Sequence, residues 1–114
     1  MLSRKAASDP GRLRLRLILE KPARTPDGAG GATLGWTATG IVAADVTPVR
    51  ADERGSGEGM ADAVLHKIIL RHRPDVAPGD RFRLGARLFL ILAVTDPQED
   101  GRYLACLAEE EGRP

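Results

Sequence analysis

Residues 12–19 read RLRLRLIL, with leucine at each odd position from 13 to 19 and arginine at the even positions 12, 14 and 16. Successive side chains of an extended strand point to opposite faces, so strict alternation of this kind predicts a half-buried β-strand. We expect the leucine face to enter a core and the arginine face to lie outside it. No other stretch of the chain indicates its local structure as clearly.

The next strand is expected in residues 33–49, where alternation resumes. Its even-numbered residues from Leu34 to Val46 share one face, and a strand of this length should bend. Gly40 is where we expect a bulge or a barrel corner, and Pro48 should weaken further pairing and suit an edge position. Between the two strands, residues 21–31 contain two prolines and the cluster DGAGG, which predicts a long hairpin loop.

The rest of the chain predicts four more short strands separated by turn signals. Proline and glycine follow one another in VAPGD at residues 76–80, and DPQEDG at residues 96–101 is typical of a hairpin loop. The strands are expected in residues 64–73, 81–84, 86–94 and 102–108. About six short strands with turns between them are typical of an all-β protein, either a small antiparallel β-barrel or a sandwich.

A long mobile loop is expected in the middle of the chain. Residues 50–63 read RADERGSGEGMADA and contain almost no large apolar side chain that could hold a core contact. A short helical turn near residues 60–63 should form there only on assembly. Loops this long inside a compact domain are uncommon and are often functional. The predicted organisation is therefore a flexible N-terminal arm at 1–11, one β-barrel domain at 12–110 and a C-terminal tail at 111–114.

Composition excludes several classes of protein. A chain of 114 residues has the size of one domain, and its 17 basic and 16 acidic side chains nearly cancel. That balance argues against binding to DNA or to a membrane by bulk charge. The longest apolar stretch, residues 88–94, is far shorter than a membrane span, and no secretory signal is recognised. Cys106 is the single cysteine, which excludes an intrachain disulfide and predicts a small core residue.

No catalytic, metal or cofactor site is expected. His66 and His72 are the only histidines, and six residues of extended strand separate them by roughly 20 Å, too far to share a metal. We expect both to be exposed or lightly packed. Ser56 lies in the mid-chain loop without the strand, turn and helix that position a nucleophilic serine. The chain is therefore expected not to be an enzyme.

A small nucleic-acid-binding β-barrel is the alternative function. Such barrels combine a basic groove with exposed aromatic rings on which bases stack. Here Trp36 shares the apolar face of its strand, Phe89 lies in an apolar run, and Phe82 lies between two arginines. With Tyr103 these are all the aromatic residues, and none forms an obvious stacking platform. This alternative predicts salt-sensitive binding to oligonucleotides.

The order of these motifs resembles the phage head-tail joining family, which includes head-closure (stopper) and adaptor proteins. The resemblance covers about residues 11–110, and each motif alone is only turn chemistry with alternation. Its motifs are GxLRxRL at 11–17, DGxGG leading to Trp36, AxDVxP at 43–48, HKIILRHRPDVAPGDR at 66–81, GxRxFxI at 85–91, and the closing DP to GRYL at 96–104. The glycine-rich loop after Arg50 and the pair Ala105-Cys106 depart from the family pattern.

The resemblance implies a ring of identical subunits below the portal, through which packaged double-stranded DNA passes. The implied partners are other copies of this chain, a portal-side adaptor ring, and tail terminator or other tail proteins, with no membrane. The protein would be made in the bacterial cytoplasm and reside in the virion. Because the chain is nearly all strand, we favour head closure over an adaptor. The arginine- and alanine-rich composition suits a high-GC bacterial host. Gene transfer agents, phage-derived particles that carry host DNA, use connector proteins that resemble this family, so the resemblance also implies such a particle as a source.

Two sets of residues are candidate contacts in such a ring. The arginine face could meet acidic residues of a neighbouring subunit; it comprises Arg12, Arg14 and Arg16, and the acidic residues are Glu109, Glu110 and Glu111. The mid-chain loop could order on assembly, narrow the channel or dock on the next ring; its candidate contacts are Arg50, Asp52, Glu53, Arg54, Glu58 and Met60. A solvated strand face and a passive linker are the respective alternatives.

Overall fold

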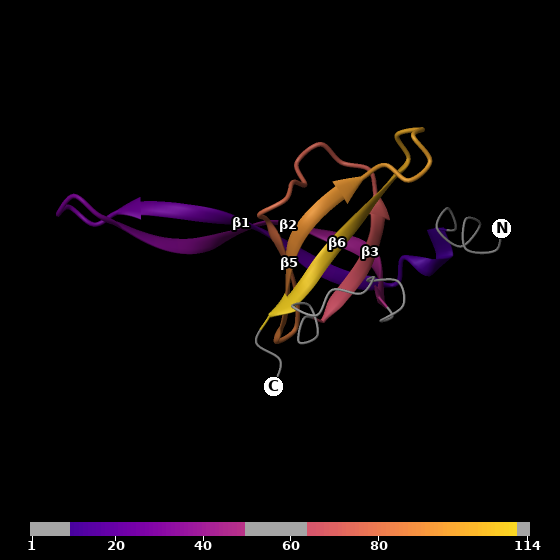
Figure 1. Ribbon diagram of the computed structural model, residues 1–114, viewed down its shortest axis with the longest axis horizontal. Helices are drawn as coiled ribbons and strands as arrows, with labels where there is room; N and C mark the ends of the chain where they lie inside the picture. The colour runs from indigo at the N-terminus through magenta and orange to yellow at the C-terminus, as the bar shows by residue number, and fades with distance from the viewer. Residues whose placement is uncertain (1–9, 50–63, 112–114) are drawn as a thin grey trace, which may run out of the picture.

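The computed structural model describes residues 10–49 and 64–111, which form a six-stranded antiparallel β-sheet (Figure 1). The elements are a 3₁₀ turn η1 (Pro10–Arg12) and the strands β1 (Leu15–Pro26), β2 (Ala32–Pro48), β3 (Leu65–Arg71), β4 (Arg81–Leu84), β5 (Arg87–Thr95) and β6 (Tyr103–Glu111). The predicted all-β class is confirmed. The candidate residues in 50–63 lie outside the described residues.

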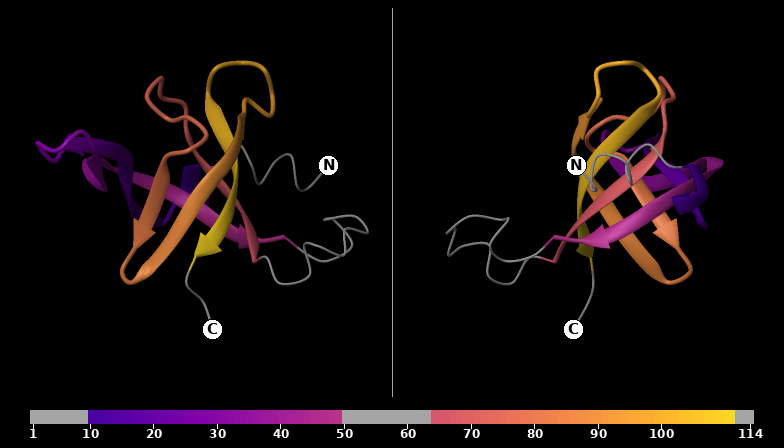
Figure 2. Two further views of the ribbon diagram at one scale, coloured as in Figure 1. Left: turned by 60° about the vertical axis from the view of Figure 1, so that its left-hand side comes forward. Right: turned by 90° about the vertical axis from the view of Figure 1, so that its right-hand side faces the viewer.

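The sheet closes on itself as a small barrel in the strand order β1-β2-β3-β6-β5-β4 (Figure 2). The closing contact pairs Glu20 of β1 with Arg81 of β4 and extends to Ile18 and Arg83. Closure matters because it removes the unpaired strand edges that an open sheet would present. The barrel part of the chain therefore offers its outer surface, and not strand edges, to other molecules.

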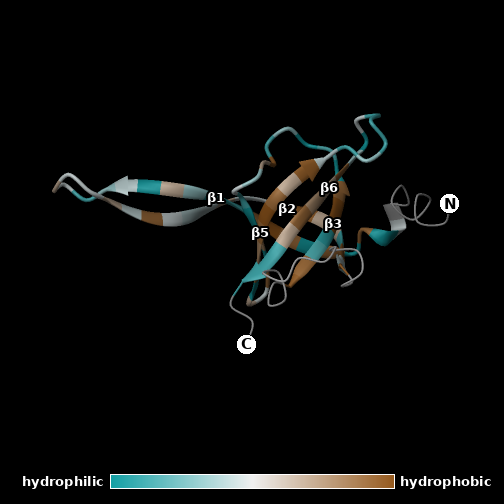
Figure 3. Cartoon of the chain, in the orientation of Figure 1, coloured by the Kyte–Doolittle hydropathy of each residue, from teal (hydrophilic) through white to brown (hydrophobic). Residues whose placement is uncertain are grey.

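The apolar core fills the barrel interior. Phe82 and Phe89 face each other across β4 and β5, and both are fully buried, as are Leu17 and Leu19 of the predicted leucine face. Burying each such side chain contributes about 1.5–3 kcal/mol. Cys106 is also buried in this core, as predicted. Figure 3 shows apolar residues concentrated on the barrel strands and polar residues in the connecting loops.

The prediction of a long loop in residues 21–31 is wrong. Strand β1 continues to Pro26 and pairs with β2 in register up to Pro26 opposite Ala32, so that the loop contains only residues 27–31. Pro22 and Pro26 are four residues apart and therefore share one edge of β1. Beyond Glu20 that edge has no neighbouring strand, so proline costs no ladder hydrogen bond there.

The predicted bulge near Gly40 is confirmed. Leu19 pairs with Gly40 but the next residue, Glu20, pairs with Ala38, which leaves Thr39 as the extra residue of β2. A Cβ on Gly40 would lie 3.3 Å from Nη2 of Arg73, so the absence of a side chain lets this guanidinium lie against the strand. The bulge marks the point where the hairpin leaves the barrel.

Two further expectations needed correction. The last strand runs beyond the predicted Ala108, through Glu109 and Glu110 to Glu111, so the acidic end belongs to β6 and not to a tail. Leu34 shares a parity with the core residue Val42, yet it is 73% exposed because β2 has left the barrel by that point. Alternation identified the strand, but it could not show where the strand stops covering a core.

Candidate assembly interface

The most prominent surface feature is the outer part of the β1–β2 hairpin, residues 21–38, which we call the arm (Figure 1). It projects away from the barrel. Strand β4 reaches β1 only at residues 18–20, and β3 reaches β2 only from Ala44 onward. Both edges of the arm are therefore unpaired in the described structure, and most of its side chains are exposed.

The tip of the arm has a defined turn. Oδ1 of Asp27 accepts hydrogen bonds from the backbone N–H groups of Ala29 (2.8 Å) and Gly31 (3.1 Å), and the N–H of Asp27 donates to the carbonyl of Gly31 (3.2 Å). These backbone hydrogen bonds hold the pKa of Asp27 below its ordinary value. Gly28 and Gly30 adopt φ of 82° and 86°, the left-handed region that favours glycine.

A buried carboxylate fixes the base of the arm. Glu20 is 6% exposed and accepts hydrogen bonds from Nε of Arg81 at 2.6 Å and from Nε of Arg83 at 2.9 Å. Burial alone would raise the pKa of Glu20, but the hydrogen bonds and charges of the two arginines outweigh it and hold the pKa below its ordinary value. The last residue of β1 inside the barrel is thus tied to β4 by charge as well as by backbone pairing.

Two more contacts brace the arm against the barrel. The guanidinium of Arg81 lies over the ring of Trp36, 4.2 Å from its centroid. On the neighbouring strand, Nζ of Lys21 lies 2.6 Å from Oδ2 of Asp80, which also accepts a hydrogen bond from the N–H of Ala77 at 3.0 Å. Contacts on both strands of the arm hold its direction relative to the barrel.

The Glu20 site predicts acid-sensitive stability. Because its pKa is lower in the folded chain than its ordinary value of 4.5, the contribution of Glu20 is fully present well above pH 4.5 and is lost as the pH falls through the folded value. Thermal unfolding followed from pH 7 to pH 3 should show a smaller loss in Glu20→Gln than in the wild type. Some loss should remain, since Asp27 and Asp75 also have lowered pKa values. Equal pH profiles would contradict this role.

A second charged cluster fills the barrel end where β6 finishes. Glu110, whose side chain is 1% exposed, accepts hydrogen bonds from Nε of Arg87 at 2.8 Å and from Nη2 of Arg87 at 3.1 Å. Nε2 of His66 lies 3.7 Å from Oε1 of Glu110, and the imidazole packs edge-on against Phe89 at 5.1 Å between centroids. The arginine also lies over the Phe89 ring, 4.9 Å from its centroid.

The expectation that both histidines are exposed or lightly packed is wrong for His66, which is 3% exposed. His66 shares the inward face of β3 with Ile68 and Leu70, so alternation places it inside the barrel beside the Glu110 carboxylate. His72 follows the end of β3 and is exposed, as expected.

The predicted arginine face is only partly free. Nη2 of Arg12 lies 3.7 Å from Oδ2 of Asp45, and Nε of Arg14 donates to the carbonyl of Gly11 at 3.0 Å. Arg12, Arg14 and Asp45 line a shallow hollow of about 280 Å³. Arg12 lies in η1 and Arg14 just before β1, whereas Arg16 is exposed on β1 itself. Asp45 of β2 therefore supplies, within one chain, an acidic neighbour that we had expected from another subunit.

The predicted acidic partners lie on a different part of the barrel. Strand β6 pairs with β3 and β5 and not with β1, so a single chain does not bring the two sets together. Glu110 is buried and bound to Arg87, while Glu109 and Glu111 are half-buried. Of these two, Glu111 approaches Arg81 at 4.0 Å.

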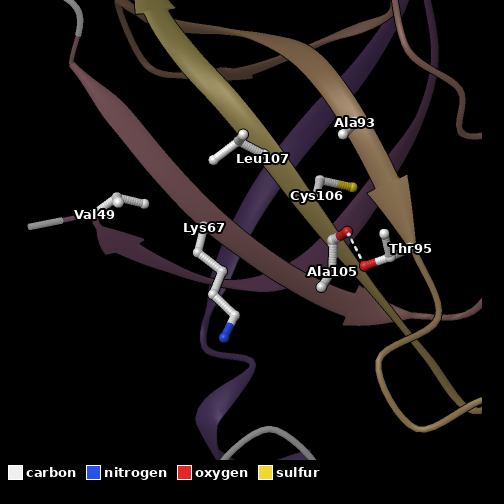
Figure 4. A pocket seen from close by; sticks show the side chains of 7 residues that line it. All are labelled: Val49, Lys67, Ala93, Thr95, Ala105, Cys106 and Leu107. Carbon is white, nitrogen blue, oxygen red and sulfur yellow. Dashed lines mark hydrogen bonds between the residues drawn. The ribbon is translucent and has the colours of Figure 1, made fainter. Parts of the chain in front are cut away.

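An apolar groove crosses the outer surface of β6 (Figure 4). It has a volume of about 330 Å³ and is lined by Val49, Lys67, Ala93, Thr95, Ala105, Cys106 and Leu107. Leu107 is 37% exposed, and Oγ1 of Thr95 donates to the carbonyl of Ala105 at 3.3 Å. The lining is mainly small and apolar with one cation, Lys67, at its side.

The described residues contain no group of three or more His, Cys, Asp or Glu side chains placed to hold a metal ion. In the same part of the chain, no helix is long and apolar enough to cross a membrane. Burial raises the pKa of the Cys106 thiol to about 12, so that the thiol stays protonated near neutral pH.

The aromatic residues do not form a surface on which bases could stack. Phe82 and Phe89 are fully buried, and Tyr103 is 6% exposed. Trp36 is half-buried beneath the guanidinium of Arg81. Because base stacking needs an accessible ring face, this arrangement does not favour the nucleic-acid-binding alternative.

Sequence reasoning missed the anchors of the arm and of the barrel end. Glu20 is a charged residue directly after the apolar run 17–19, and Arg81 and Arg83 alternate around Phe82. Those signals suggest buried ion pairs, but the partners are 61 and 63 residues apart. Only the closure of the barrel brings them together.

The similarity to known proteins extends over the whole barrel. The family model described as "Phage head completion protein" matches residues 8–111. A chain in a structure of the virion of a native gene transfer agent particle is 42% identical, with a TM-score of 0.65, over 85% of this chain and 93% of that chain. The solution structure of SF1141 from Shigella flexneri 2a shares the fold, with 24% identity and a TM-score of 0.74 over 93% and 99%. No curated protein matches.

Proposed function

Because the chain belongs to the phage head completion protein family, we propose that it forms a ring that closes the head and joins it to the tail. The chain is a structural protein of the virion, and its family comprises phage head proteins. The match over residues 8–111 carries the proposal, because it spans every strand of the barrel. The particle is either a tailed phage or a gene transfer agent.

The architecture supports a ring subunit. A ring of identical subunits needs a rigid body and two different surfaces that meet repeatedly around an axis. We propose that residues 12–110, whose described strands close into a barrel, are the rigid connector domain. The outer groove along β6, the exposed Arg14 and Arg16, and the braced arm are separate surfaces available for neighbours. The proposed neighbours are other copies, a portal-side adaptor ring and tail proteins.

Passage of double-stranded DNA through the ring is part of the proposal. A channel must let DNA slide, so a strong attraction to phosphate would oppose its task. The formal net charge of +1 suits passage better than tight binding. Some of the exposed arginines among the described residues are partly neutralised, as the contact between Arg12 and Asp45 illustrates. We infer a structural role for this chain and not a catalytic one.

Electron microscopy of particles from a producer strain lacking this gene tests the function. We expect DNA-filled or emptied heads beside complete, unattached tails, and complementation with the wild-type gene should restore joined particles. Emptied heads would support head closure, whereas filled heads without tails would support a joining role alone. Normal joined particles from the deletion strain would contradict the proposal.

A further inference from the structure

The two edges of the arm differ in a way that indicates their use. The β1 edge carries Pro22 and Pro26, which prevent another strand from pairing with it. The β2 edge has no neighbouring strand from Ala32 to Ala43, although the guanidinium of Arg73 lies against β2 at Gly40. Residues 32–44 themselves contain neither proline nor any charged side chain. Natural sheets protect exposed edges with proline or charge. One edge of this arm is protected and the other is not.

The register shows which groups the β2 edge presents. Proline has no N–H, so Pro22 and Pro26 are accommodated in the non-hydrogen-bonded pairs of the antiparallel ladder, opposite Trp36 and Ala32. The backbone hydrogen bond from Asp27 to Gly31 agrees with this assignment, because it makes the adjacent pair, Asp27 and Gly31, a hydrogen-bonded one. By alternation, Leu34, opposite Arg24, also turns its N–H and C=O outward. Even-numbered residues 32–38 of β2 thus offer a row of unpaired donors and acceptors, which ends at the bulge at Thr39. Beyond the bulge the odd-numbered residues face this side, as the hydrogen bond from Val49 to Leu65 of β3 shows.

Basic side chains lie at the barrel end of this β2 edge. Where β2 separates from β3, a hollow of about 260 Å³ is lined by Ile41, Val42, Ala43, Leu70, Arg71, His72 and Arg73. Arg73 is bound to Asp75 at 2.6 and 2.9 Å. Arg71 is exposed and makes no ion pair with the described residues. A strand added along β2 would reach this cation at its end.

We propose that the free β2 edge binds an extended segment of a different protein of the particle by strand addition, with an acidic side chain of that segment meeting Arg71. Main-chain hydrogen bonds would give affinity, and the uncharged, threonine-rich edge suits a segment of alternating apolar and polar residues. The inference rests on the proposed function, since it names a class of partner for the arm.

A second copy of this chain fits the edge less well. The closed barrel has no free edge of its own, so the described part of a second copy offers only its arm. Its β1 edge is blocked by Pro22 and Pro26. Two β2 edges could pair about a two-fold axis, but such a contact closes a dimer and does not repeat around a ring. It also brings no free carboxylate to Arg71, because Asp27 at the tip of the arm already accepts the hydrogen bonds of its own turn.

A matched pair of proline variants tests the edge. Leu34→Pro removes an outward N–H from the β2 edge, while Arg24→Pro does the same to the β1 edge at the paired position. Each is expressed in the gene-deletion strain, and its amount per head protein is measured in purified particles by quantitative mass spectrometry. We expect Leu34→Pro to reduce incorporation or head-tail joining at least about tenfold and Arg24→Pro to change it by less than about twofold.

Control measurements separate folding from binding. Leu34→Lys keeps the backbone and adds a charge to the edge, so it should reproduce the loss even if Leu34→Pro unfolds. Arg71→Glu should reduce incorporation, whereas Arg102→Glu, an exposed arginine on the loop before β6, should not. Normal incorporation of both Leu34 variants would overturn the edge proposal, and it would leave the proposed function intact if the deletion strain still fails to join heads to tails.

The identity of the partner is tested by a photo-crosslinker placed at Leu34 in assembled particles. Crosslinks to an extended segment of another virion protein, with an acidic residue crosslinking in turn to position 71, would support the proposal. In mixed particles containing isotope-labelled and unlabelled copies, crosslinks between copies of this chain would overturn it. An absence of crosslinks in fully joined particles would also overturn it.

Discussion

Replacing Glu110 with alanine should lower the free energy of unfolding by about 3 kcal/mol. The carboxylate is almost fully buried and holds Arg87 through hydrogen bonds at 2.8 and 3.1 Å, with His66 beside it at 3.7 Å. Removing it leaves a cation at the barrel end without its partner and opens a small cavity next to Phe89. The partial exposure of Arg87 keeps the cost at the lower end of the range for broken buried pairs.

Chemical denaturation of the purified chain measures this loss of free energy, and thermal unfolding should show a Tm lower by more than about 10 °C. Glu109→Ala is the matched control, because Glu109 is the neighbour of Glu110 on the same strand but is only half-buried, so its loss should change stability by less than about 0.5 kcal/mol. Glu110→Gln keeps the side-chain volume and removes the charge, so it separates the loss of the ion pair from the opening of a cavity. A loss below about 1 kcal/mol for Glu110→Ala would show that the cluster contributes little.

Replacing Glu20 with alanine should cost about 2–3 kcal/mol and loosen the arm. Arg81 has a side chain only 12% exposed and would lose its closest anion. Its contacts with Trp36 and, at 4.0 Å, with Glu111 remain and limit the loss. Because Glu20 ties the base of the arm to β4, hydrogen exchange in residues 21–38 should rise more than exchange in β3 and β6.

Denaturation and hydrogen-exchange mass spectrometry test both parts of this prediction. Arg24→Ala is the control on the arm, since Arg24 is exposed and should change neither quantity measurably. If the Glu20→Ala arm exchanges like that of the wild type while stability falls, the carboxylate stabilises the barrel without orienting the arm. Particles carrying this variant should join fewer heads to tails, because a loosened arm binds with a larger entropic cost.

The fold was largely predictable because its signals are local. Alternation at residues 12–19 correctly identified the face that buries Leu17 and Leu19, but the strand begins only at Leu15, which is itself exposed, and Arg12 belongs to a 3₁₀ turn. The turn signals at 76–80 and 96–101 delimited the later strands. The bulge beside Gly40 also followed from one residue. These features depend on chain periodicity and backbone conformation, which neighbouring residues determine.

The candidate interface was less predictable because it depends on contacts between distant residues. Pro22 and Pro26 indicated a loop, but only the register reveals that both face an unpaired edge. His66 and Glu110 seemed to be surface residues until β3 and β6 paired and placed both inside the barrel. Opposite charges that neutralise each other across 61 residues, as Glu20 and Arg81 do, leave no periodic signal.

The strand order also determines when each strand of the barrel can pair during translation. Strand β6 is the last of the described strands to be synthesised, and it pairs with both β3 and β5, so these two strands each lack a neighbour until β6 emerges. Strand β1 likewise cannot pair with β4 until β4 has been made. Translation of such a chain takes on the order of ten seconds, and pairing of distant strands is intrinsically slow. During that interval the nascent chain exposes the facing edges of β3 and β5 together with the uncharged residues 32–44 of β2. A host chaperone, or a low rate of synthesis, should therefore govern how much soluble subunit is available for each particle.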